Sequence, residues 1–214
     1  MIHVKFCGIR REEDVQAVNR LRPDFAGFVF AESKRQITAE TAAGLKTQLD
    51  PEIKTVAVLV NMPAEEAATL ADTGIADLLQ LHGDEDAEYI ARLKTLTGAK
   101  IIKAIRLQGN EADRTVLKQA EKADFYLFDT FIADAYGGTG KTFSHSLLKD
   151  LPIGKPFFLA GGLDADNVAG IVGQMQRDEK LLPYFYGVDV SGGIETEGYK
   201  DPIKMEIFMK VIRG

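Results

Sequence analysis

Two residues with acid–base chemistry follow short apolar runs in distant parts of the chain. Cys7 ends the strand-like run 3–7, and its thiol becomes a base or nucleophile once it is ionised. Asp129 follows the four large apolar residues of 125–128, where partial desolvation would raise the pKa of its carboxyl and let it hold a proton. The alternatives are a buried cysteine that only packs and an aspartate that only bonds its own turn.

Loops that contain glycine follow two further apolar runs near the C-terminus. Gly161 and Gly162 come directly after one run, and Ser191 and Gly192 come after the next. Glycine lets backbone N–H groups approach an anion closely, and a following helix N-terminus adds positive charge. The duplication predicts a phosphate site made by these four residues, and the alternative is a pair of tight turns.

Three other features could contact a ligand. Arg35 could bind a carboxylate through two parallel hydrogen bonds, or be a solvated loop charge. His82, after the apolar run 78–81, could bond in a pocket or cap a turn. Residues 137–142 resemble a nucleotide-binding phosphate loop, but Ala135 stands where its first glycine belongs. A glycine-rich lid is the alternative for this segment.

The chain contains eight short runs rich in Val, Ile and Phe, separated by segments with helical spacing. Strands that alternate with helices pair in parallel with right-handed crossovers. A doubly wound sheet typically has five or six strands, whereas eight units favour a closed barrel. The sequence therefore predicts an α/β fold, a single (β/α)8 TIM barrel over residues 1–214. The predicted strands begin near His3, Phe25, Lys54, Leu78, Lys100, Phe125, Pro156 and Gly187.

Helix signals lie between these runs. Apolar spacing predicts helices over 11–21 and 203–213. Asn61, Asp84 and Asp164 are the predicted N-caps of three others. In such a barrel the active site forms where the strands end, which would gather the strand-end side chains at one mouth.

The composition limits the class of partner. The chain has 214 residues with 26 Lys plus Arg and 32 Asp plus Glu, so the net charge is 26 − 32 = −6. A pI near 5.2 argues against a nucleic-acid partner. No apolar run approaches the roughly 20 residues of a membrane span, and the N-terminus lacks the features of a secretory signal. One cysteine suits the reducing cytoplasm. The three histidines fit no compact ligand spacing, so no metal site is predicted.

A set of short stretches, in order along almost the whole chain, resembles the phosphoribosylanthranilate isomerase family of tryptophan biosynthesis. The resemblance implies a barrel that catalyses an Amadori rearrangement of N-(5-phosphoribosyl)anthranilate, a small phosphosugar, without a cofactor. The sequence makes no prediction of the oligomeric state. The stretches are 5–9, 27–30, 33–35, 80–83, 103–106, 128–130, 137–143, 159–163, 187–193 and 200–201.

The resemblance also implies roles for individual residues. Asp129 would be the general acid that protonates the furanose ring oxygen, and Cys7, as a thiolate, the base that removes the C2 proton. Arg35 would hold the anthranilate carboxylate, and His82 and Asp189 would contact the substrate. The loops that contain Gly161, Gly162, Ser191 and Gly192 would hold the phosphate.

A thiolate at Cys7 requires help from its surroundings, because a thiol pKa of about 8.5 leaves little thiolate at neutral pH. Lys5 lies two residues earlier on the same strand face, and we expect it to lower that pKa.

Three other functions compete with this interpretation. The indole-forming synthase of the same pathway relies on a lysine at the end of the third strand, and the run 56–60 contains none. A phosphopentose epimerase would need metal-binding His and Asp residues at several strand ends, and these are absent. A non-catalytic phosphosugar-binding barrel has the same motifs, and only an activity assay separates it from an enzyme.

Overall fold

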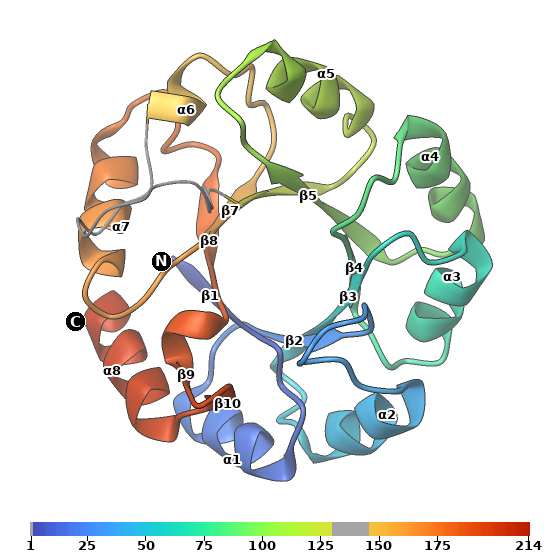
Figure 1. Ribbon diagram of the computed structural model, residues 1–214, viewed down its shortest axis with the longest axis vertical. Coiled ribbons are helices and arrows are strands. Elements are labelled where there is room, and N and C mark those ends of the chain that lie inside the picture. Colours follow the sequence, from blue (N-terminus) through green and yellow to red (C-terminus); the bar gives the residue numbers. More distant parts are fainter. Residues whose placement is uncertain (1, 130–145) are drawn as a thin grey trace.

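The computed structural model describes residues 2–129 and 146–214, and its eight parallel strands close into a barrel (Figure 1). Each strand pairs with the next, and β8 pairs with β1 to close the ring. The predicted (β/α)8 barrel is therefore confirmed. The strands are β1 His3–Cys7, β2 Phe25–Val29, β3 Lys54–Leu59, β4 Leu78–Leu81, β5 Lys100–Arg106, β6 Phe125–Asp129, β7 Phe157–Ala160 and β8 Phe185–Val190.

Helices surround the barrel, outside the ring of strands (Figure 1). The first and last begin within one residue of the predicted positions, and none among the described residues is long and apolar enough to cross a membrane. The helices are α1 Glu12–Leu21, α2 Ala39–Gln48, α3 Ala64–Asp72, α4 Ala87–Leu96, α5 Glu111–Gln119, α6 Ser146–Lys149, α7 Val168–Arg177 and α8 Pro202–Arg213.

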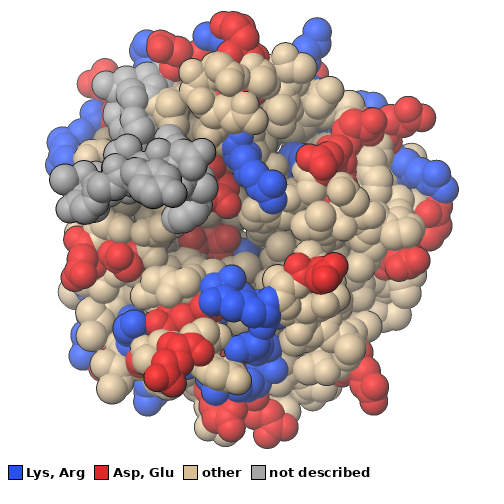
Figure 2. All heavy atoms as spheres, in the orientation of Figure 1, with Lys and Arg blue, Asp and Glu red and all other residues tan. Residues whose placement is uncertain are grey.

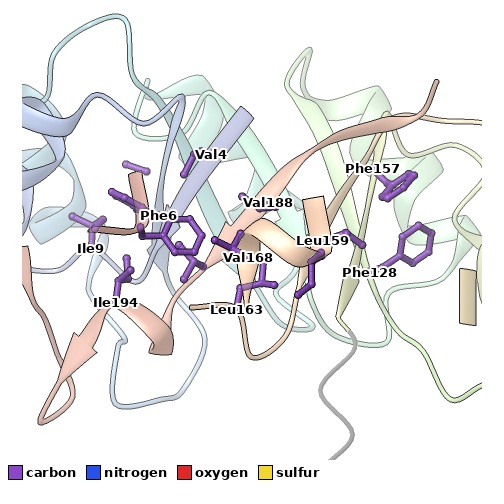
Figure 3. Packing of buried hydrophobic residues seen from close by; sticks show 14 of the residues in the cluster. Val4, Phe6, Ile9, Phe128, Phe157, Leu159, Leu163, Val168, Val188 and Ile194 are labelled. Atoms are coloured by element: carbon purple, nitrogen blue, oxygen red, sulfur yellow. The ribbon is translucent and has the colours of Figure 1, made fainter. Parts of the chain in front are cut away.

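Strand alternation divides the apolar side chains between the barrel interior and the helix layer. One cluster fills the interior and includes Phe25, Leu78 and Phe158. The outward side chains form two further clusters, and in the larger one Phe128 of β6 and Phe157 of β7 stack edge to face at 5.3 Å between ring centres (Figure 3). Because β1 turns its even residues outward, its odd residues are left to face the interior.

The last strand begins two residues before its predicted start. Gly187 lies inside β8, where a Cβ would collide with the carbonyl oxygen of His3 in β1. Glycine is thus needed for close strand contact there, and its place in the sequence is no sign of a strand end.

The three predicted N-caps are wrong: each observed N-cap lies two or three residues later in the chain. Asn61 has φ +51° and accepts from the backbone N–H of Asp84 through its side-chain oxygen. Pro63 and Asp86 stand at the N-caps of α3 and α4 instead. Asp164 accepts from two backbone N–H groups in the turn before α7, whose N-cap is Asn167.

A short hairpin follows β8, which sequence reasoning did not predict. A 3-10 turn at Gly192–Ile194 leads into β9 Glu195–Thr196 and β10 Tyr199–Lys200, which pair antiparallel. The hairpin lies on the viewed face of Figure 1, beside β1 and β2. It brings Glu195 and Lys200 close to the ends of these strands.

Candidate active site

The carboxyl ends of the strands surround a cavity of about 820 Å³, called here the mouth cavity. In Figure 2 the viewed face is hollowed near its centre, with acidic side chains inside the hollow and basic ones beside it. All nine residues predicted for the site line this cavity. They are Cys7, Arg35, His82, Asp129, Gly161, Gly162, Asp189, Ser191 and Gly192. The segment 137–142, which resembles a nucleotide-binding phosphate loop, lies outside the described residues.

Cys7 stands at the end of β1 above a buried ion pair. Its side chain is 7% exposed and packs with Val29 and Val58. Lys5, wholly buried below it, donates from Nζ to Asp189 Oδ1 at 2.9 Å. Burial alone would lower the pKa of Lys5, but the charges of Asp189 and Cys7 outweigh it, so the pKa is raised. Lys5 therefore stays a cation beneath the thiol.

The pKa of the Cys7 thiol is raised, contrary to the expectation from the sequence. Burial raises it most, Lys5 lowers it, and Asp189 raises it again. Lys5 thus acts in the expected direction, but burial and the carboxylate of Asp189 outweigh it. A thiolate formed here is scarce and correspondingly basic, which suits removal of a carbon-bound proton.

The thiol can be titrated alone, because Cys7 is the chain's one cysteine. We expect Lys5→Met to raise its pKa further by removing a cation, and Asp189→Asn to lower it by removing an anion. The double variant should fall between the two. Thiolate absorbance, with Cys7→Ala as the blank, measures each value. An unchanged pKa in Lys5→Met would show that Lys5 does not influence the ionisation of the Cys7 thiol.

Asp129 ends β6 with its side chain about a quarter exposed, next to His82. The two side chains approach to 3.5 Å between His82 Nε2 and Asp129 Oδ2. Gln80, on β4, donates from Nε2 to Nδ1 of His82 at 3.0 Å. The imidazole therefore bonds inside the cavity and does not cap a turn.

A buried ion pair holds the loop that carries His82. Lys103 of β5 donates from Nζ to Glu85 at 2.8 Å and to the carbonyl oxygen of Gly83 at 2.6 Å. Glu85 in turn accepts from the backbone N–H groups of Gly83 and Asn61. These bonds fix the turn after β4, and with it the position of the imidazole.

Arg35 lines the mouth cavity, but its guanidinium is already engaged. Its Nε and Nη2 donate to the two carboxylate oxygens of Glu195 at 2.6 and 2.8 Å. Lys200 donates to Glu195 at 2.7 Å and to the carbonyl oxygen of Ser191 at 3.0 Å. Burial would raise the pKa of Glu195, but the bonds from Arg35 and Lys200 outweigh it and hold the pKa at about 2.

The sequence analysis did not identify Glu195, although this carboxylate fixes the orientation of the Arg35 guanidinium. The two residues are 160 positions apart, and no local pattern links them. The residue before the 3-10 turn also reaches the end of β1, since Ser191 donates from Oγ to the carbonyl oxygen of Cys7 at 2.9 Å. The network therefore joins the predicted carboxylate ligand, a phosphate loop and the end of β1.

The glycine loops after β7 and β8 lie against each other. Gly161 and Gly162 have φ +93° and +66°, which L side chains rarely adopt. A Cβ on Gly193 would collide with the carbonyl oxygen of Leu163. Within the described ranges, no acceptor takes the backbone N–H of Gly161, Gly162 or Gly192. These groups can therefore donate to an anion.

No group of three or more His, Cys, Asp or Glu side chains in the described parts of the chain could hold a metal ion. The groups that line the mouth cavity include a thiol, carboxyls, an imidazole, guanidinium groups and the backbone of the glycine loops.

Comparison with known proteins gives a consistent result. A family model described as N-(5'-phosphoribosyl)anthranilate (PRA) isomerase matches residues 4–211. The N-(5'-phosphoribosyl)anthranilate isomerase of Thermoanaerobacter pseudethanolicus is 47% identical, covering 100% of this chain and 99% of that protein. The crystal structure of phosphoribosyl anthranilate isomerase from Thermotoga maritima is 32% identical, covering 99% of this chain and 98% of that one, with a TM-score of 0.81.

A further solved structure bears on the ligand. It is a phosphoribosyl anthranilate isomerase in complex with reduced 1-(o-carboxyphenylamino)-1-deoxyribulose 5-phosphate. It is 29% identical, covers 98% of this chain and 97% of that one, and has a TM-score of 0.78.

Proposed function

This chain belongs to the N-(5'-phosphoribosyl)anthranilate isomerase family, and we propose from that premise how its mouth cavity performs the reaction. The substrate, N-(5'-phosphoribosyl)anthranilate, is rearranged to 1-(2-carboxyphenylamino)-1-deoxyribulose 5-phosphate in tryptophan biosynthesis. The observation that carries the proposal is that the thiol of Cys7, the carboxyl of Asp129 and the two glycine loops after β7 and β8 line one cavity. Residues 1–214 form the catalytic barrel.

The first step opens the sugar ring. Asp129 gives its proton to the furanose ring oxygen, the C1–O bond breaks, and the anilino nitrogen's lone pair forms a Schiff base with C1. In the second step the Cys7 thiolate removes the C2 proton, and the C2–H electrons form an enolamine. Protonation at C1 and loss of the enol proton then give the ketone. The reaction is an isomerisation, so no oxidant or reductant is consumed.

Each part of the substrate has a counterpart in the cavity. The phosphate binds the N–H groups of the loops after β7 and β8, formed by Gly161, Gly162, Ser191 and Gly192. Asp189 of β8 and His82 after β4, which both line the cavity, face the sugar carbons. Arg35 binds the anthranilate carboxylate from the β2 side, in the orientation that Glu195 imposes.

Arg35→Met tests the carboxylate contact. We expect KM to rise about tenfold or more with a smaller change in kcat, because the contact exists in substrate and transition state alike. Lys34→Met is the matched control, since Lys34 is an exposed neighbour that reaches Glu195 only at 3.7 Å. An unchanged KM in Arg35→Met would place the carboxylate ligand elsewhere.

The activity itself is measured by the loss of anthranilate fluorescence when the chain is mixed with N-(5'-phosphoribosyl)anthranilate. We expect rapid loss with the wild type. Calorimetric binding of a phosphosugar without any loss of fluorescence would instead support a non-catalytic barrel.

The proposed catalytic thiol of Cys7 also indicates a cellular compartment. A catalytic thiol must escape oxidation, and the cytoplasm keeps thiols reduced. We therefore place the enzyme in the cytoplasm.

A further inference from the structure

We propose that Gln80 and His82 are positioning residues for the general acid: Gln80 fixes the tautomer of His82, so that the imidazole presents an N–H to Asp129. The inference rests on the proposed function, because it gives His82 a task in the reaction other than contact with substrate. Neither residue transfers a proton to or from the sugar in this account.

The orientation of the Gln80 amide sets the tautomer. The amide nitrogen of Gln80 is only a donor, so at 3.0 Å from Nδ1 of His82 it requires that nitrogen to accept. The proton of the neutral ring is then on Nε2, which is the nitrogen 3.5 Å from Asp129 Oδ2. Apo geometry of this kind often tightens once substrate is bound.

The position of Gln80 is unfavourable for stability. The side chain is 1% exposed and faces inward on β4, between Val58 of β3 and Ile102 of β5. Its Oε1 is buried with no hydrogen-bond partner in the part of the chain that the structure describes. An apolar residue would avoid this unmade bond. Packing therefore does not account for an amide here, whereas its bond to His82 does.

The amide orientation and the tautomer are linked. Turning the amide over would place Oε1 on Nδ1, put the ring proton there, and leave the amide nitrogen unpartnered instead. The lone pair of Nε2 would then face Asp129. The orientation in the structure is the one in which the imidazole donates toward the carboxyl.

This donation matters most after the first proton transfer. Asp129 becomes a carboxylate when its proton moves to the ring oxygen, and an N–H directed at it stabilises the new charge. A bond that strengthens as charge develops lowers the barrier to the chemical step and leaves substrate binding little changed. The expected signature is therefore a fall in kcat with a nearly constant KM.

Kinetics of four variants test the coupling. We expect Gln80→Met to lower kcat about tenfold, the usual size for outer partners that orient a reacting group, and His82→Phe to lower it at least as much. Because Gln80 acts only through His82, the double variant should be no slower than His82→Phe alone. Leu78→Met, on the same inward face one layer below, is the control. Losses that multiply in the double variant would overturn the proposal.

Nitrogen-15 NMR of the His82 ring gives a second result, and its decisive arm uses the wild type. We expect a neutral ring protonated at Nε2 in the wild type, and a mixture of tautomers in Gln80→Met. A ring protonated at Nδ1, or at both nitrogens, would overturn the inference even if every variant folds poorly. A wild type that leaves anthranilate fluorescence unchanged would instead overturn the proposed function, so the two failures are distinct.

Discussion

Cys7→Ala is expected to lower kcat by about two to four orders of magnitude, the range for loss of a proton-transfer group. The change removes one sulfur from a small apolar contact with Val29 and Val58, so the fold should persist. Ring opening does not use the thiol, which confines the loss to removal of the C2 proton. The fluorescence assay under saturating substrate measures kcat.

Cys7→Ser is the informative companion to this variant. It retains the size and polarity of the side chain, but a hydroxyl ionises far less readily than a thiol. We therefore expect a loss close to that of Cys7→Ala, with an equal thermal midpoint. Turnover near the wild-type rate in either variant would remove Cys7 from its role.

Asp129→Ala is expected to cost a similar two to four orders of magnitude in kcat. Without the acid, the ring oxygen must leave unprotonated, and the Schiff base does not form at a useful rate. Asp129→Asn keeps the shape and a hydrogen-bond donor but has no acidic proton, so it should be impaired to about the same extent. A phosphate-containing product analogue should still bind both variants.

The contrast between Asp129→Ala and Asp129→Asn separates acid catalysis from simple polarisation of the ring oxygen. If an amide donor at this position restores activity to near the wild-type rate, Asp129 acts as a hydrogen-bond donor only. The stepwise mechanism with a proton on Asp129 would then be wrong.

The sequence was informative wherever a local pattern determines structure. Six of the eight strands begin at the predicted residue, because alternating apolar runs between helices leave few other arrangements. The residues that follow those strands could then be assigned to one mouth, since parallel strands all end on the same side. That rule brought together Cys7 and Asp129, which are 122 positions apart by subtraction of their numbers (129 − 7).

Hydrogen bonds between residues that are distant in the sequence could not be predicted. The partner of Arg35 lies in a hairpin of two-residue strands too short to show a pattern. One of the three predicted caps failed for the same reason, because the side chain of Asn61 bonds the backbone of a loop 23 positions away. The pKa of Cys7 depends on how deeply the thiol is buried, which alternation along a strand does not reveal.

In the proposed complex, one substrate lies with C2 at the sulfur of Cys7 and its ring oxygen at the carboxyl of Asp129. A crystal structure of this chain with reduced 1-(o-carboxyphenylamino)-1-deoxyribulose 5-phosphate would show whether the ligand lies in this way. We expect C2 in contact with Sγ, the C4 oxygen that derives from the ring within hydrogen-bond distance of Asp129, and the phosphate on the loops after β7 and β8. An analogue bound with C2 remote from Cys7, or with its C4 oxygen remote from Asp129, would contradict the account.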